Sequence, residues 1–258
     1  MRWILKKGPY MTRHLLLLAL AAFVVLPATA VRAQTADEVI EKSVVAQGGR
    51  AALGKLTSRS ASGTITIGTP VGDITGTIEL YNKLPNKART LVKADLSSLG
   101  AGQITQDQRF DGAVGYAMDS LNGNRDITGD QLEVMRSNVF PSPFLNYKEA
   151  GVRAELLGKE KVGDKDAYVI RLTPKAGPAS RVFFDAQSYL PVRTIVSLNV
   201  PQLGTEVEQT AEFVEYRDLD GVKVPSRVRS VNQLQTLTIV LTKIEQNIPL
   251  DDSMFVKP

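Results

Sequence analysis

Alternation of apolar and polar residues with a period of two runs through most of the chain. Ile65 and Ile67 alternate with threonines, and a similar run covers 74–80. This pattern predicts half-buried β-strands. Further runs of the same kind lie at 87–95, 103–110, 113–119, 152–162, 167–173, 181–185, 192–200, 206–216, 222–231 and 236–244. Short Asp-Gly connections at 111–112 and 220–221 favour hairpins, so we expect about a dozen antiparallel strands.

Helical spacing replaces this alternation before the first strand. Thr35 and Glu38 are three residues apart, as in a capping box, and the apolar stripe that follows stops at Gly48-Gly49. We expect a helix there and a second short turn over 50–56.

One later segment also interrupts the strand pattern. Thr128 and Gln131 repeat the capping-box spacing, and apolar residues follow at helical intervals. We interpret 129–150 as one or two amphipathic helices, interrupted by Pro141 and Pro143. The predicted fold class is mainly β with a few helices, in which a single curved antiparallel sheet is covered on its concave side.

The first 33 residues have the pattern of a secretory signal peptide. Basic residues precede twelve apolar residues at 15–26, and small residues lead to Ala33. Twelve residues are fewer than the roughly 20 that span a bilayer, so we expect a cleavable signal rather than an anchor. The prediction is a signal peptide over 1–33, starting at Met1 or Met11, and one periplasmic domain over 34–258 without a stable transmembrane segment.

Removal of this segment changes the chemistry of the chain. It holds the only histidine, His14, the only tryptophan, Trp3, and five of the 31 Lys and Arg residues, with no Asp or Glu. The 26 basic residues that remain face 27 acidic ones, so the net charge is about −1 rather than +4. A near-neutral domain gives no support for nucleic-acid binding, which needs clustered basic residues.

Most catalytic designs are excluded by the same composition. Residues 34–258 contain neither histidine nor cysteine, so Ser-His-Asp and Cys-His nucleophiles are impossible and the usual zinc, copper and haem ligands are missing. No glycine-rich nucleotide motif occurs. We therefore expect no cofactor, no metal and no catalytic residue. A carboxylate hydrolase stays open as an alternative, because two acidic residues suffice for glycosidases.

Two acidic motifs have simpler interpretations. Asp251-Asp252 is more typical of a capped turn than of a catalytic pair. Asn122, Asn124, Asp126 and Glu133 have the spacing of a calcium loop, but isoleucine stands at position 127, where that loop needs glycine. We interpret this segment as a polar loop before a helix.

The property that remains for a function is apolar surface, which can bind apolar ligands. Alternation gives as candidate cavity lining Ile65, Ile67, Ile78, Leu80, Phe110, Tyr116, Met118, Ile170, Phe184, Phe213, Leu237 and Ile239, and as candidate lid Leu132, Met135, Phe140 and Phe144. A curved sheet with such an inner face can enclose a ligand. The same residues could instead fill a closed core. A slip of one residue would move a strand's candidates to the other face.

Several strings, in order, resemble landmarks of a known family. They are Leu80-Tyr81-Asn82-Lys83-Leu84-Pro85-Asn86, Phe110-Asp111-Gly112 with Tyr116 after it, 168–175, and Phe183-Phe184-Asp185. Together they resemble the LolA-like periplasmic lipoprotein-carrier superfamily over nearly all of 34–258. The strings at 46–49, 216–229 and 247–258 are similar to its outer membrane lipoprotein-sorting protein-like branch.

This resemblance implies a half-barrel of antiparallel strands with a helical lid over an apolar cavity. It implies a non-catalytic periplasmic protein that shelters a lipid or an acylated protein cargo, as a transport chaperone in lipoprotein sorting to the outer membrane. The alternative is an envelope interaction or sensing module of the same fold with a protein partner. The chain departs from the family at Leu84, where the carriers have an arginine that holds the lid closed, and in lacking their tryptophan-rich lining.

Overall fold

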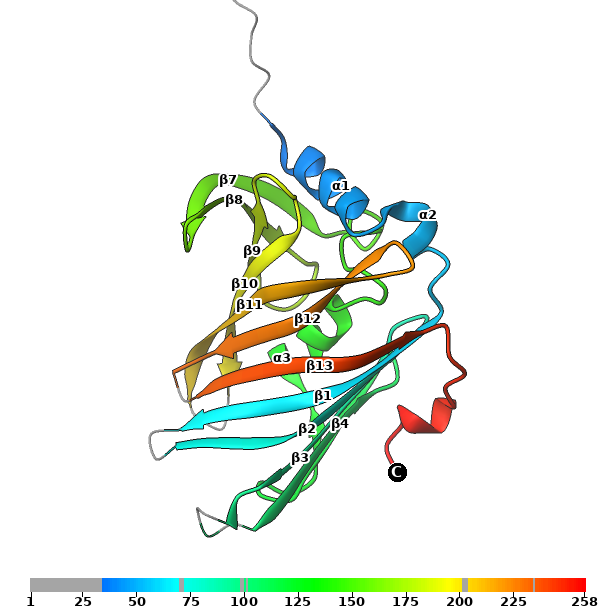
Figure 1. The fold of residues 1–258 in the computed structure, drawn as a ribbon, viewed down its shortest axis with the longest axis vertical. Helices are drawn as coiled ribbons and strands as arrows, with labels where there is room; N and C mark the ends of the chain where they lie inside the picture. Colours follow the sequence, from blue (N-terminus) through cyan, green and yellow to red (C-terminus); the bar gives the residue numbers. More distant parts are fainter. Residues whose placement is uncertain (1–33, 70–71, 98–99, 101, 201–203, 234) are drawn as a thin grey trace, which may run out of the picture. The chain divides into compact units, whose positions relative to one another are not determined.

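The computed structural model describes residues 34–69, 72–97, 100, 102–200, 204–233 and 235–258, and the predicted signal peptide lies outside them. Thirteen strands in this part of the chain form one sheet, all pairs antiparallel, in the order β6-β5-β4-β3-β2-β1-β13-β12-β11-β10-β9-β8-β7 (Figure 1). The two edge strands, β6 and β7, do not pair with each other, so the sheet is open. The predicted mainly β fold, a single antiparallel sheet with few helices, is confirmed.

The strand bounds follow the alternation closely. They are β1 (Ser58–Thr69), β2 (Gly72–Lys83), β3 (Lys87–Asp95), β4 (Gln103–Phe110), β5 (Gly115–Asp119), β6 (Arg125–Ile127), β7 (Arg153–Val162), β8 (Lys165–Thr173), β9 (Ser180–Asp185), β10 (Pro191–Val200), β11 (Thr205–Leu219), β12 (Val222–Val231) and β13 (Thr236–Gln246). The short strand β6 was not predicted, because its three residues show too little alternation to distinguish it from a loop.

Three α-helices lie within the described residues: α1 (Ala36–Ala46), α2 (Gly49–Leu53) and α3 (Gly129–Ser137). The Thr35–Glu38 capping box is confirmed, since each residue's backbone N–H donates to the other's side chain, at 3.0 and 3.2 Å. The prediction of helix over all of 129–150 is wrong beyond Ser137, because Pro141 and Pro143 cannot continue a helix. None of the described helices has the length and apolar character needed to cross a membrane.

The residues after α3 instead form turns that join the core. Phe140, Phe144 and Tyr147 are buried together with Val39 and Val44 of α1. This cluster also contains inward side chains of β8, β9 and β12. We call the face of the sheet that carries this cluster the inner face.

Helix α3 shows how strongly the sheet curls. At its start, Asp130 Oδ2 accepts a hydrogen bond from the backbone N–H of Asn199 on β10, at 2.9 Å. Leu132 Cδ1 and Met135 Sδ each lie 3.4 Å from where a Cβ atom on Gly115 of β5 would be. Seven strands separate β5 from β10, about 38 Å across a flat sheet. A nine-residue helix is only about 14 Å long, so the inner face must be concave.

Irregular pairing contributes to this curvature. The register between β1 and β13 shifts at Ser62/Gly63, and further shifts occur in β7, β10 and β11. Gly63 is required at its shift, since a Cβ atom there would lie 2.0 Å from the carbonyl oxygen of Val240. Such bulges bend a strand and increase its twist.

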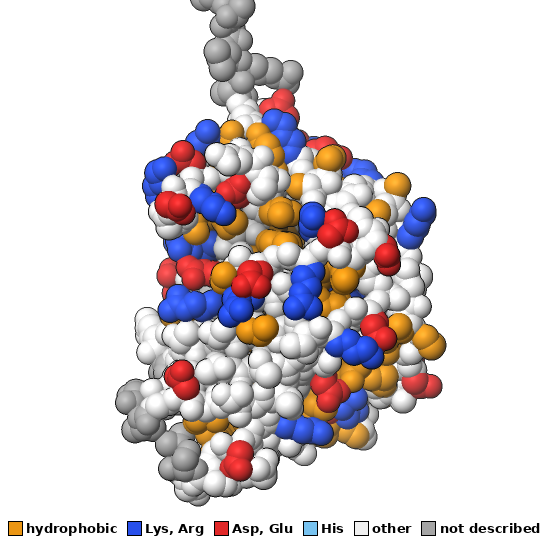
Figure 2. All heavy atoms as spheres, in the orientation of Figure 1, with side chains coloured by type: hydrophobic (Ala, Val, Ile, Leu, Met, Phe, Trp, Pro, Cys, Tyr) orange, Lys and Arg blue, Asp and Glu red, His pale blue; other side chains and the backbone are white. Residues whose placement is uncertain are grey.

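The outer face is polar over the central strands and covered by the C-terminal tail near one edge. Figure 2 shows a surface over β1 and β2 with few charged or hydrophobic side chains. The tail is held by Asp252, which pairs with Lys83 and Lys87 at 2.8 and 2.7 Å, and by Phe255, which is 1% exposed. Asp251 accepts a hydrogen bond from the Ser253 backbone N–H, so the capped-turn interpretation is confirmed.

Candidate functional site

The centre of the inner face carries apolar side chains that are only partly covered. Ile65, Ile78, Val92 and Leu241 are buried at its base. Packed against them are side chains that remain half-buried, and we call these the inner strip: Ile67, Leu80, Leu237, Ile239 and Ile244. Apolar groups in this position are accessible to a ligand while lying on the concave side of the sheet.

Six of the predicted lining residues meet here. Ile65, Ile67, Ile78, Leu80, Leu237 and Ile239 belong to one cluster of β1, β2 and β13. Phe213 of β11 is half-buried and pairs with Val228, which in turn pairs with Ile239. The structure therefore places Phe213 beside this cluster.

Three other candidates are enclosed in the core. Phe110, Ile170 and Phe184 are fully buried. Ile170 and Phe184 lie in the cluster with α1, where the Phe144 ring meets Phe184 edge-on with centroids 5.3 Å apart. For these residues the structure favours the packed core that the alternation left open.

Tyr116 and Met118 lie on the opposite face. In the β4–β5 pairing they stand across from Arg109 and Asp107, whereas the buried Phe110 stands across from Gly115. On the outer face, Lys257 of the tail lies over the Tyr116 ring, with its Nζ atom 4.4 Å from the centroid. The predicted bounds of this strand lie within two residues of those of β5. The predicted inward positions were wrong by one residue, because the true inner face of Gly115, Ala117 and Asp119 carries few apolar side chains.

The predicted lid residues divide into two groups. Leu132 and Met135 are half-buried in α3, which spans the concave side as described above. Phe140 and Phe144 are buried in the turn segment 138–152 beneath α1 and α2. Only α3 is positioned over the open part of the inner face.

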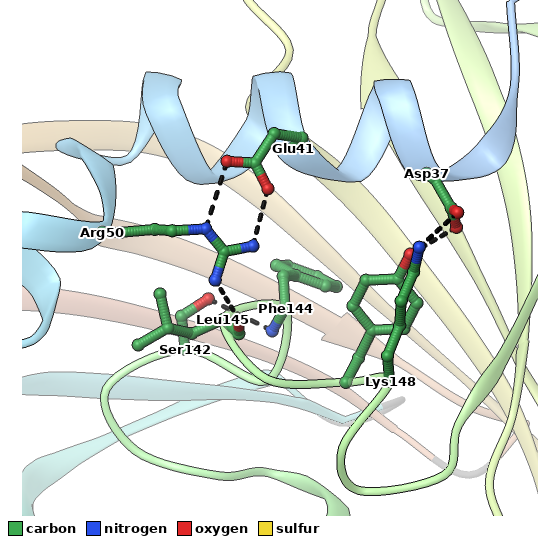
Figure 3. Close-up of polar contacts among 8 residues, drawn as sticks. Asp37, Glu41, Arg50, Ser142, Phe144, Leu145 and Lys148 are labelled. Carbon is green, nitrogen blue, oxygen red and sulfur yellow. Dashed lines mark hydrogen bonds and ion pairs between the residues drawn. The ribbon is translucent and has the colours of Figure 1, made fainter.

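Charged residues fasten the turn segment to the helices (Figure 3). Arg50 of α2 donates two hydrogen bonds to Glu41 of α1, at 3.2 and 2.6 Å, and a third to the Leu145 carbonyl, at 2.7 Å. Asp37 accepts hydrogen bonds from Lys148 and Tyr147, which lower its pKa. Arg50 thus donates a hydrogen bond to the turn segment, while Leu84, where the sequence resemblance leads us to compare with an arginine, is 38% exposed.

Two cavities lie apart from the inner strip. One of about 320 Å³ is bordered by these charged residues of α1, α2 and the turn segment. A second of about 760 Å³ lies between the start of β1 and residues 247–251. The residues compared with a calcium loop have separate partners: Asn122 with Asp119, Asp126 with Lys257 and Glu133 with Arg136. Among the described residues, no acidic or histidine cluster suits a metal ion.

One cationic side chain, that of Arg59, lies on the inner face at the end of the inner strip nearest α2. Arg59 of β1 pairs with Asn82 of β2 and Gln246 of β13, so the three side chains form a polar row. The Arg59 guanidinium lies over the Phe140 ring, 5.3 Å from its centroid. Burial lowers the pKa of Arg59 to about 10. Its odd-numbered position, shared with Ala61 and Ile65, was the available sequence signal that it points inward.

Known structures match this architecture. A LolA superfamily protein from Nitrosomonas europaea superposes with a TM-score of 0.57 and 15% identity, covering 87% of this chain and 99% of that one. The fold is LolA-like. A putative outer membrane lipoprotein-sorting protein domain from Vibrio parahaemolyticus has a TM-score of 0.54 and 12% identity, covering 85% and 95%.

A DUF1329 family protein from Desulfovibrio piger also superposes on this chain, with a TM-score of 0.54, 14% identity, and coverage of 86% and 97%. The sequence matches no protein-family model, and no curated protein matches it by sequence. At such identities the likeness establishes the architecture, so the ligand must be argued from the side chains of this chain.

Proposed function

We propose that this LolA-like chain is a periplasmic, non-catalytic binding protein whose inner strip shelters an acyl chain of a lipid or lipoprotein. The observation that carries the proposal is the half-buried state of Ile67, Leu80, Leu237 and Ile239 on the concave face crossed by α3. A closed core would cover these side chains completely.

Apolar contact supplies enough free energy for such binding. Each methylene group moved from water to an apolar surface contributes about 0.8 kcal/mol, so an acyl chain of ordinary length needs no cofactor or covalent step. The Ile and Leu side chains of the strip have no hydrogen-bonding groups that a hydrocarbon would leave unsatisfied.

Two further observations support the cellular location and the cargo. The signal-peptide pattern over 1–33 favours export to the periplasm. The structural similarity to a putative lipoprotein-sorting domain supports acylated cargo and a role in outer membrane lipoprotein sorting.

The test compares neighbouring positions on opposite faces of β13. Ile239 is part of the inner strip, whereas Thr238 lies on the outer face, paired with Thr66 and Arg229. We expect wild type and Thr238→Gln to bind a fluorescent fatty acid equally and Ile239→Gln to bind about tenfold more weakly, since a polar amide loses part of the apolar contact.

Native mass spectrometry of gently purified protein gives an independent measurement. Wild type should carry a lipid of defined mass. A wild-type protein that neither carries lipid nor binds the fluorescent fatty acid would overturn the proposal.

A further inference from the structure

Arg59 stands out among the enclosed arginines of the sheet. Arg89 and Arg109 share the carboxylate of Asp107, and Arg193 pairs with Glu212. Among the described residues, no carboxylate pairs with Arg59, and its Nε atom, like that of Arg193, is buried without a hydrogen-bond partner. Enclosed charges are normally paired, because an isolated one loses its hydration without compensation.

A second unmatched donor lies beside it. Gln246 is the cross-strand partner of Arg59, and its Nε2 atom is also buried without a hydrogen-bond partner. A guanidinium has five donors and no acceptor, and the amide nitrogen adds two more donors. Two adjacent donor groups of this kind complement the oxygens of an anion, such as a carboxylate or a phosphate.

Phe140 supports the guanidinium without using its donors. The contact between Arg59 and the Phe140 ring is of the cation–π type. A ring offers no conventional acceptor in competition with an anion. The side chain is therefore held while its hydrogen-bonding capacity stays unused.

The position of this pair relates it to the inner strip. Ala61 follows Arg59 on the same face, and its partner Ile244 packs against both the strip's cluster and the cluster under α1. From Arg59 to Ile67 the strand covers eight residue steps, about 26 Å. The hydrocarbon of one bilayer leaflet is about 15 Å deep, so an acyl chain lying along β1 fits with its head group at Arg59.

The geometry points to Arg59, assisted by Gln246, as the binding site for the anionic head group of the lipid whose chain lies on the inner strip. This assignment rests on the proposed acyl-chain binding. It narrows the ligand class to a lipid with an anionic head group, a carboxylate or a phosphate.

The experiment varies the head group at constant chain length. Isothermal titration calorimetry of the full 34–258 domain would use palmitate, 1-palmitoyl lysophosphatidic acid and 1-hexadecanol. We expect at least one of the two anionic ligands to bind wild type about tenfold or more tightly than hexadecanol, the gain of a charge-assisted hydrogen bond. The tighter of the two identifies carboxylate or phosphate as the head group.

Substitutions then test whether Arg59 is responsible for the preference for anionic ligands. Arg59→Met should lower the affinity for the anionic ligands to that for hexadecanol and leave hexadecanol binding unchanged. Arg153→Met removes the same charge from the exposed start of β7 and should preserve the preference. Arg59→Lys keeps the charge without the planar fork and should retain part of it. Because Met replaces an unpaired enclosed charge, Arg59→Met should melt no lower than wild type.

The possible failures are distinguishable. Equal affinity of wild type for palmitate, lysophosphatidic acid and hexadecanol overturns the head-group site and leaves acyl-chain binding intact. An anionic preference that survives Arg59→Met also overturns the site. Binding of none of the three ligands overturns the proposed function itself. The wild-type comparison decides the matter even if a variant does not fold.

Discussion

Asp107 lies on the outer face of β4, almost fully enclosed, with two arginines as its partners. Arg89 donates two hydrogen bonds to it, at 2.8 and 2.7 Å, and Arg109 donates two more, at 3.2 and 2.9 Å. Burial alone would raise the pKa of Asp107, but these bonds outweigh burial and hold the pKa below its ordinary value of 3.8. This site is complete in itself, unlike that of Arg59.

Replacing this carboxylate should be costly. We expect Asp107→Asn to lower the free energy of unfolding by about 3 kcal/mol, because two enclosed arginines lose their counter-charge. Asp166→Asn breaks an exposed pair with Lys161 and should lower the free energy of unfolding far less, because solvent screens an exposed ion pair. Urea unfolding at neutral pH measures both. Equal effects of the two substitutions would contradict this account of the network.

The pH dependence of the wild type follows from the same carboxylate. A lowered pKa in the folded state means that the unfolded state binds more protons as acid is added. The stabilisation by Asp107 is therefore present above pH 3.8 and is lost as the pH falls through the lowered pKa.

Among the elements, the turn segment after α3 depends on the charged side chains of α1 and α2. Exchange of Arg50 for methionine should loosen residues 142–148, because the Leu145 carbonyl and Glu41 lose a shared donor. Hydrogen–deuterium exchange should rise in that segment and stay unchanged in β1 and β13. Lys55→Met, an exposed position with the same charge loss, is the control. Protection that persists in 142–148 would show that burial of Phe144 and Tyr147 and the hydrogen bonds to Asp37 hold the segment without Arg50.

The elements also show how far sequence patterns reach. Alternation predicted the strands, and the capping box predicted α1, because both depend on neighbours along the chain. Alternation did not show which apolar side chains would be covered. Ile170 and Phe184 lie beneath α1, whereas Ile67 and Ile239 remain half-buried. That difference is set by segments distant in sequence.

Long-range packing also explains the outer-face errors. Tyr116 has an aromatic side chain, which favoured an inner position, but Lys257 of the C-terminal tail covers its ring on the outside. Arg59 illustrates the reverse case. It is a charged side chain on the inner face, and Gln246 becomes its neighbour only through the pairing of β1 with β13.

At the scale of the whole sheet, α3 connects strands that are far apart in strand order. Its contacts with β5, which is next to the edge strand β6, and with β10 on the other side of the centre mean that a ligand on the inner strip would lie between the sheet and this helix. The hydrogen bond from the Asn199 N–H to Asp130 is exposed and lies at the β10 end of the helix, whereas Arg136 at the other end donates to the Ala113 carbonyl at 2.8 Å. The β10 end of α3 can therefore control access to the strip.

This arrangement makes a kinetic prediction. Asp130→Ala should speed dissociation of a bound fluorescent fatty acid several-fold in stopped-flow displacement, since the helix loses a hydrogen bond to β10 and opens more often. The free energy of unfolding should fall by only about 1 kcal/mol, the value of one hydrogen bond. Asp164→Ala, at an exposed position in the β7–β8 hairpin, provides the control. An unchanged dissociation rate would mean that the ligand leaves along the open sheet rather than past α3, and the helix would then serve to hold the curvature of the sheet.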